Sequence, residues 1–286
     1  MSTKSDAIPA SPLAPLISQF LYVKEPEIDF MELTRAVRRY CGNVDPGHLP
    51  GKDSQMAHYF MTDAVAEFKE GRLPTQLCLV KARPVSAQVR EQIQDSLHQT
   101  WNWEAAGEVS AACRYIVVAS DFMAGSLERA VRNRQFRGFL RAIQETIPAD
   151  AIHCLNSQLV VNPVEFLRQQ EGETGEQMMA SINVRLFRIE GTNGDCLMDT
   201  MGLAVLGLPD VQCHFRQLDC GQMAGKLYDI AIYLFEKGDV ISDGETVAGL
   251  EPMQWWKCQH EMAMVGPERM VLDLNPGPPF AACGRN

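Results

Sequence analysis

Apolar and polar positions alternate with two different periods along this chain, and the changes of period predict its elements. Apolar residues recur at helical spacing between Phe30 and Tyr40, where Asp29 can cap the start and Gly42 can end the helix. Further helices are expected from Ser86 and over 126–146, 163–170 and 223–237. β-Branched, aromatic or alternating stretches predict short extended segments over 17–23, 56–61, 76–82, 113–119, 151–155, 158–161, 179–189, 240–241, 246–247, 255–264 and 270–274.

These elements divide the chain into two halves. The stretch 171–177 is polar, contains glycine and lacks large apolar residues, which is typical of a boundary. We therefore expect a flexible tail over 1–15, an N-terminal α/β half over 16–170 and a C-terminal α+β half over 178–286. Strands mixed with flanking helices predict an α+β fold of two layered halves, with helices packed on mostly antiparallel sheets. The order of elements in the first half is compatible with a ferredoxin-like arrangement.

Composition narrows the class of protein. A chain of 286 residues with 46% hydrophobic and 22% charged residues is typical of a folded protein. The net charge of −10 argues against nucleic acid or an anionic membrane as the principal partner. The polar, proline-rich start lacks the pattern of a secretory signal, which predicts a cytoplasmic protein. Because the nine cysteines are scattered as single residues, we expect free thiols and no disulfides.

The segment Gly194–Phe215, called here the signature segment, concentrates the residues that could carry chemistry. Its apolar run is interrupted by Gly202 and Gly207 and stopped at Pro209-Asp210, which indicates a buried stretch with constrained backbone. Such a stretch is either core or the wall of a site. If it lines a catalytic site, the residues expected there are Asp199, Asp210 and His214.

No complete catalytic or metal-binding motif accompanies these residues. The chain lacks a P-loop, a GxGxxG sequence and a GxSxG elbow. The sets Cys213, His214, Cys220 and Cys258, His260, Glu261 lack the paired spacing of zinc sites. We therefore expect no metal and no cofactor, and an enzyme is the less favoured interpretation.

Four arginines on the predicted helix over 126–146 are candidate partner-binding residues: Arg129, Arg132, Arg137 and Arg141. A basic helix face on an acidic protein is usually only solvated. The sharper interpretation is a docking surface for a carboxylate-rich partner.

The signature segment resembles a bacterial domain of unknown function. Its DTMGLAVLGLPDVQCHF sequence over 199–215 is similar to the pattern D-T-x-G-L-x-x-L-G-L-P-D-x-Q-x-H-F of that family. The later GDVI over 238–241 and LDLNP over 272–276 are similar to its following blocks, and the region around Trp101 and Trp103 resembles the part that precedes it. One departure is Cys113-Arg114, where that family has a histidine before the strand.

The resemblance implies a standalone cytoplasmic bacterial protein. Because some members of this family accompany genes for secreted toxins and type VI secretion, it also implies an immunity protein that binds and blocks a cognate toxin. Acidic charge fits an inhibitor of a basic partner. The competing hypothesis is an enzyme whose site is lined by Asp199, Asp210 and His214, and a third is that the signature segment only forms core.

Overall fold

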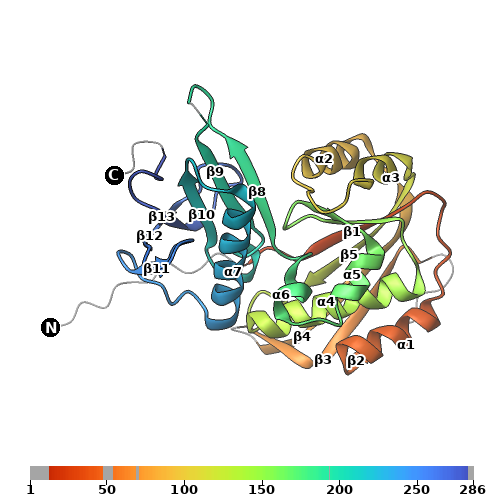
Figure 1. Cartoon of the computed structure of the whole chain (residues 1–286). Helices are drawn as coiled ribbons and strands as arrows, with labels where there is room; N and C mark the ends of the chain where they lie inside the picture. The colour runs from red at the N-terminus through yellow and green to blue at the C-terminus, as the bar shows by residue number, and fades with distance from the viewer. Residues whose placement is uncertain (1–12, 48–53, 69–70, 193, 283–286) are drawn as a thin grey trace.

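Two mostly antiparallel sheets with packed helices make up the protein, which confirms the expected α+β fold (Figure 1). The computed structural model describes residues 13–47, 54–68, 71–192 and 194–282. The first sheet has seven strands in the order β2-β3-β4-β5-β1-β6-β7, and the second has six in the order β11-β12-β13-β10-β9-β8. Within the second sheet, β10 and β13 are parallel neighbours.

The first sheet and its helices use the chain up to the predicted boundary. Their bounds are β1 Ile17–Tyr22, α1 Phe30–Cys41, β2 Val44–Asp45, β3 Met56–Phe68, β4 Gly71–Pro84, α2 Ala87–Leu97, α3 Ala106–Ala112, β5 Tyr115–Phe122, α4 Arg129–Thr146, β6 Ala151–Cys154, β7 Leu159–Val161 and α5 Pro163–Gln169. The Asp29 side chain accepts hydrogen bonds from the first turn of α1, and Ser86 caps α2. The predicted cap Asp29 is confirmed, and the helix expected from Ser86 begins directly after it.

Strand order in the first sheet differs from the ferredoxin-like arrangement. In that arrangement the first strand would lie directly beside the third of the four. Here β5 lies between β4 and β1 and pairs with both. The order of elements along the chain therefore fits the motif, whereas the pairing of the strands does not.

Helices cover both faces of the first sheet (Figure 1). On β1, Phe20 and Tyr22 belong to the core shared with α1 and α4, whereas Leu21 belongs to a smaller core with α2 and α3. Successive side chains of a strand point to opposite faces, so β1 contributes to both layers.

The second half begins with a short helix. Its elements are α6 Thr174–Met178, β8 Asn183–Arg188, β9 Cys196–Met201, the 3₁₀ turn η1 Ala204–Leu206, β10 Asp210–Phe215, α7 Cys220–Lys237, β11 Thr246–Ala248, β12 Trp255–Met262 and β13 Met270–Asn275. The helix α6 falls in the stretch expected to be an irregular boundary. No side chain caps its start, so the sequence carries no start signal there.

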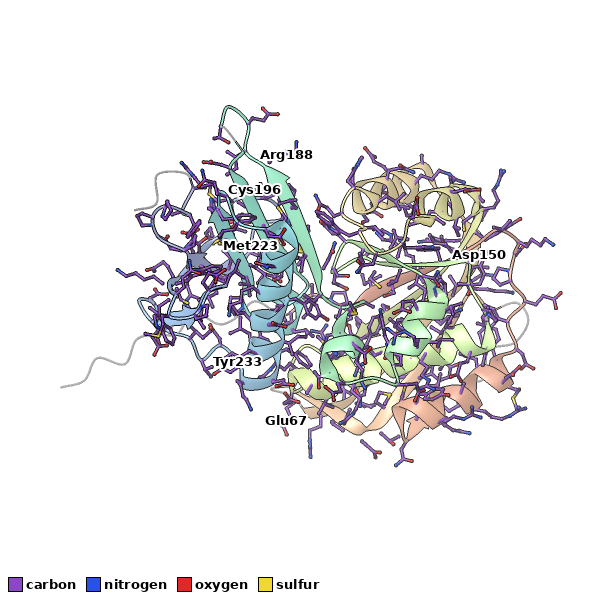
Figure 2. The ribbon with its side chains drawn as sticks, in the orientation of Figure 1. Glu67, Asp150, Arg188, Cys196, Met223 and Tyr233 are labelled. Atoms are coloured by element: carbon purple, nitrogen blue, oxygen red, sulfur yellow. The ribbon has the colours of Figure 1, made fainter. Side chains whose placement is uncertain are left out.

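One continuous hydrophobic core joins the halves. It extends from Phe20 in the first sheet to Trp256 in the second and includes the inner face of α7. The helix α7, on which Figure 2 labels Met223 near the start and Tyr233 in the second half, lies between the second sheet and the first half. Arg129 of α4 donates hydrogen bonds to the carbonyls of Phe235 and Glu236 at the end of α7.

The expected tail over 1–15 lies outside the described residues up to position 12. The carbonyl of Ala14 accepts a hydrogen bond from Arg132, and that of Pro15 accepts one from Asn156. The last residues before β1 are therefore anchored to the folded protein.

Candidate functional site

The signature segment forms two neighbouring strands, β9 and β10, joined by a compact turn. Gly202 has a φ of 134°, and a Cβ there would overlap the backbone carbonyl of Ser181. Gly207 ends η1 in the left-handed conformation, with a φ of 78°. Both glycines are therefore required by backbone geometry, as the sequence indicated.

The two faces of β10 are chemically different. Val211, Cys213 and Phe215 belong to the hydrophobic core that includes α7. The alternate residues Asp210 and His214 have their side chains on the other face, because side chains alternate along a strand. All six residues of the strand are buried, so this polar face is enclosed by protein.

Asp199 of β9 lies between two arginines. Arg185 of β8 donates to both of its carboxylate oxygens, at 2.8 and 2.7 Å. Arg269, just before β13, donates to Oδ2 at 2.7 Å. Asp199 is 0% exposed, so this carboxylate is completely enclosed with its two cationic partners.

Asp210 is held by the same arginine and by the turn. Arg269 Nε donates to its Oδ2 at 3.1 Å, while Thr200 Oγ1 and the backbone N–H of Leu203 donate to Oδ1, each at 3.1 Å. Burial raises the pKa of Asp210, and the charge of Arg269 opposes that rise. A raised carboxyl pKa is a property of many catalytic acids. This carboxyl is 0% exposed, however, and its hydrogen bonds fix the turn of the signature segment.

Arg269 is the centre of the cluster formed by Arg185, Asp199, Asp210 and Arg269, called here the arginine cluster. Its remaining hydrogen bonds go to the carbonyls of Thr200, Val265 and Pro267. With the two aspartates, these acceptors match the five N–H donors of a guanidinium. Removing one partner of such a buried network leaves charges without compensation, which typically costs about 3–5 kcal/mol.

A second polar group lies on the same face and is called here the Gln212 cluster: Gln212, His214, Glu261 and Asp273. Gln212 Nε2 donates to Glu261 Oε1 at 3.1 Å and to Asp273 Oδ1 at 3.2 Å. His214 Nε2 lies 3.8 Å from Asp273 Oδ1. The ligand atoms of His214, Glu261 and Asp273 all lie within 4.8 Å of one another. Glu261 is only half-buried, so this cluster reaches the surface.

The structure places the three residues expected to line a catalytic site in two adjoining polar groups on one face of β9 and β10, where Asp199 pairs in register with Gln212. Asp199 and Asp210 meet at Arg269, whereas His214 belongs to the Gln212 cluster. Cys213 is adjacent to His214 and therefore points to the other face of β10, into the hydrophobic core.

The four candidate arginines of α4 make contacts within the protein. Arg132 is 2% exposed and pairs with Asp121 at 2.6 Å, so its assignment to a solvated helix face is wrong. Arg129 binds the end of α7, and Arg137 binds Gln170 and Gln177. Arg141 donates to Glu145 at 3.0 Å and stacks on Tyr40. These arginines hold α4 against its neighbours.

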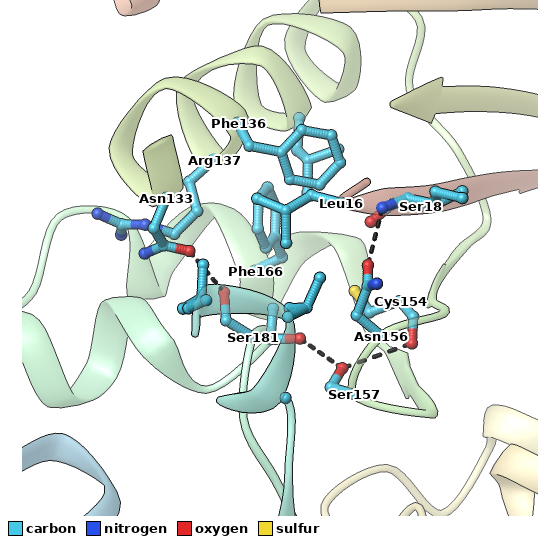
Figure 3. A pocket seen from close by; sticks show the side chains of 16 residues that line it. Leu16, Ser18, Asn133, Phe136, Arg137, Cys154, Asn156, Ser157, Phe166 and Ser181 are labelled. Atoms are coloured by element: carbon cyan, nitrogen blue, oxygen red, sulfur yellow. Dashed lines mark hydrogen bonds between the residues drawn. The ribbon is translucent and has the colours of Figure 1, made fainter. Parts of the chain in front are cut away.

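Two cavities lie near the junction of the halves. The first, about 30 Å³, lies among Leu16, Phe136 and Phe166, and the polar groups of Ser157 and Ser181 at its rim are hydrogen-bonded to protein (Figure 3). It has room for about one water molecule. The second, about 400 Å³, is mostly apolar and opens between Trp101 and the face of α7 that carries Ala224 and Tyr228. That volume is in the range of small-molecule pockets.

The β11–β12 edge of the second sheet exposes large apolar side chains. Met253 is 90% exposed and Trp255 is 62% exposed. The turn before β12 is fixed by Gln254, whose Oε1 accepts hydrogen bonds from the N–H groups of Leu250 and Glu251. Met253 has a φ of 66°, in the left-handed region that non-glycine residues rarely adopt.

His260 of β12 is held between two carboxylates beside this edge. Its Nδ1 lies 2.7 Å from Asp243 Oδ1, and its Nε2 lies 3.0 Å from Asp239 Oδ1. Burial tends to lower the pKa of His260, but the hydrogen bonds to Asp243 and Asp239 outweigh it and raise the pKa. The imidazole therefore fastens the segment after α7 to β12.

Sequence reasoning did not identify Arg269 as the partner of the signature aspartates. Arg185 carried a weak signal, since an arginine in an alternating apolar strand needs a buried counter-charge. Arg269 lies in a loop 70 residues after Asp199, so no local pattern connects the two.

Comparison with protein families gives a match over part of the chain. Residues 199–275 match the model of a family described as "Domain of unknown function (DUF4261)". The matched range begins at Asp199 and includes Asp210, Arg269 and the Gln212 cluster. No curated protein matches the chain, and no solved structure matches it. Among the described residues, no helix is sufficiently long and apolar for a membrane crossing.

Proposed function

We propose that this protein is a cytoplasmic bacterial immunity protein that neutralises a cognate secreted toxin, of the kind delivered by type VI secretion, through direct binding at its β11–β12 edge. Met253 is the observation that carries the proposal. A residue other than glycine in the left-handed region costs about 1–3 kcal/mol, and such strain concentrates at functional positions. A methionine that is 90% exposed gains little from burial in the free protein. Contact with a partner gives this side chain a role.

Trp255 extends the same surface. Tryptophan is enriched among the residues that dominate binding energy at protein interfaces, and this one is 62% exposed. The strand β11 is at the edge of the sheet, where backbone groups can pair with an incoming strand. An apolar anchor beside an edge strand favours a protein partner over a small molecule.

Charge defines the chemistry of that partner. Between Asp239 and Gln259 the chain carries four carboxylates, at Asp239, Asp243, Glu245 and Glu251, and one lysine, Lys257. This acidic edge favours a basic protein surface, since complementary charge accelerates and orients association. The arginines of α4 contact other groups of the protein, so a carboxylate-rich partner is the less favoured choice.

Enclosure of the signature aspartates favours binding over catalysis. Asp199 and Asp210 are fully buried and bound to arginine, which suits a scaffold that positions the strands. If Asp199→Asn stays folded, it should therefore still neutralise the toxin. Loss of function at unchanged melting temperature would instead favour an enzyme that uses Asp199, Asp210 and His214.

Growth rescue tests the proposal directly. The product of a gene adjacent to this one is expressed as the candidate toxin in a bacterial host together with the full-length protein, and surviving colonies are counted. Wild-type protein should restore growth, and Trp255→Ala should reduce survival at least tenfold. Trp101→Ala is the matched control, because Trp101 is 55% exposed on the first half of the protein. Full rescue by Trp255→Ala would contradict binding at this edge. Absence of both rescue and a stoichiometric partner in the native host would contradict the immunity function itself.

A further inference from the structure

We propose that His214, Glu261 and Asp273 bind a divalent metal ion, for which Zn²⁺ fits the donor set best. One imidazole nitrogen and two carboxylate oxygens lie within 4.8 Å of one another. Zinc accepts this mixture of donors at bond lengths of about 2.0–2.2 Å, and three protein ligands leave a position for water.

The backbone makes this a rigid site. The ligands come from β10, β12 and β13, which are consecutive in the order of the second sheet. His214 and Asp273 are almost completely buried and Glu261 is half-buried, so an ion can enter from the side of Glu261. Sites carried on strands hold their ligands more precisely than sites on loops.

Gln212 orients the two carboxylates. Its amide donates to one oxygen of Glu261 and one of Asp273, and its own carbonyl accepts from the N–H of Met264 at 3.1 Å. Because each carboxylate has two oxygens, Gln212 and a metal ion can be bound together. Hydrogen bonds that orient metal ligands in this way commonly change affinity by about 10–100-fold.

Comparison with two other polar groups, the arginine cluster and His260 with its two carboxylates, shows why the metal site is assigned to the Gln212 cluster. In the arginine cluster, two aspartates already face two arginines. His260 has one carboxylate at each ring nitrogen, so each nitrogen already contacts an acid. In the Gln212 cluster, one imidazole nitrogen and oxygens of two carboxylates lie within 4.8 Å of one another, with no arginine or lysine among the cluster's residues. The expectation that no metal binds rested on sequence spacing, which does not detect ligands from three separate strands.

Zinc titration of the chelator-treated, full-length protein tests the site. Cys196 and Cys220 are first replaced by serine, because the two thiols interact with each other and thiolates also bind zinc. Calorimetry should show one Zn²⁺ per chain, and zinc should raise the melting temperature, since it binds the folded state. His214→Ala and Glu261→Gln should each weaken binding at least tenfold. His260→Gln, which alters the other histidine–carboxylate group, should leave affinity unchanged.

Cobalt distinguishes specific ligation from loose association. Co²⁺ bound by the wild-type protein should give visible absorption bands that His214→Ala changes, because that variant removes the nitrogen ligand. If His214→Ala does not fold, the half-buried position of Glu261 makes Glu261→Gln the deciding variant. Absence of stoichiometric Zn²⁺ binding, or binding that survives Glu261→Gln at full affinity, would overturn the proposal. Neither result depends on toxin neutralisation, so this site and the proposed function can fail separately.

Discussion

Two regions of the second sheet contrast with each other. The interior strands β9 and β10 bury charged side chains, whereas the β11–β12 edge exposes large apolar ones. In the interior, Asp199 and Asp210 are fully buried and bound to Arg269. At the edge, Met253 and Trp255 face solvent. The interior residues meet the demands of folding, whereas the edge residues are placed at some cost to folding. Changes in the interior should therefore act on stability, and changes at the edge should act on binding.

Arg269→Leu should have the largest effect. It leaves Asp199 with one arginine and Asp210 with none from the arginine cluster, so we expect a loss of about 3–5 kcal/mol in the free energy of unfolding. Urea unfolding monitored by fluorescence measures this loss of stability. Arg188→Leu, on the exposed end of β8, is the control and should change stability by less than about 0.5 kcal/mol. A loss below about 1 kcal/mol in Arg269→Leu would remove the contrast between interior and edge.

Gly202→Ala should come next. At a φ of 134° a side chain is strained, and the added Cβ must displace the carbonyl of Ser181. We expect a loss of about 3 kcal/mol, at the upper end of backbone strain. Gly191 also has a positive φ, of 75°, but nothing lies within 4 Å of a Cβ added there. Gly191→Ala should therefore cost about 1 kcal/mol in the free energy of unfolding. Equal thermal denaturation midpoints for the two variants would show that close packing at Gly202 is unimportant.

Local patterns were enough to predict most elements of the fold. Asp29, Gly42 and Ser86 stand at the ends of helices, and the sequence predicts such ends because capping depends on residues a few positions apart. The helix α3 was missed because no side chain caps its start. The strands β3 and β4 extend beyond their predicted ends, since pairing in a long hairpin supports residues that have little strand preference alone.

The candidate site was less predictable because its contacts join distant parts of the chain. The sequence indicated that Gly202 and Gly207 permit unusual backbone geometry, which is a local property. The pairing of Asp199 with Arg269 depends instead on the order of strands in the sheet. Burial of Arg132 has the same origin, because its partner Asp121 lies on another element.

His260, beside the β11–β12 edge, should contribute a pH-dependent stabilisation of the folded state that is smaller than the effects of the two interior variants. Its pKa is raised above the ordinary value of about 6.5, so the folded state binds the proton more tightly than the unfolded state. The stabilisation is therefore complete below about pH 6.5 and is lost as pH rises through the folded pKa. Because the pair is partly exposed, we expect less than about 1 kcal/mol.

Chemical denaturation at pH 6 and pH 8.5 measures this dependence. The stability difference between wild type and His260→Gln should be larger at pH 6, and Asp243→Asn should remove most of its change with pH. A difference that grows toward pH 8.5 would contradict the direction of the shift.

Met253→Asn should have the smallest effect on stability and the opposite sign. Asparagine tolerates the left-handed region, and the methionine side chain loses little when removed because it is 90% exposed. We expect a gain of up to about 1 kcal/mol in the free energy of unfolding, together with weaker rescue in the toxin assay. Met253→Leu keeps an apolar side chain and the strained backbone, so it should retain rescue without the gain. If Met253→Asn is both more stable and fully protective, the strain at this turn is unrelated to partner binding, and the edge loses its main distinction from the interior.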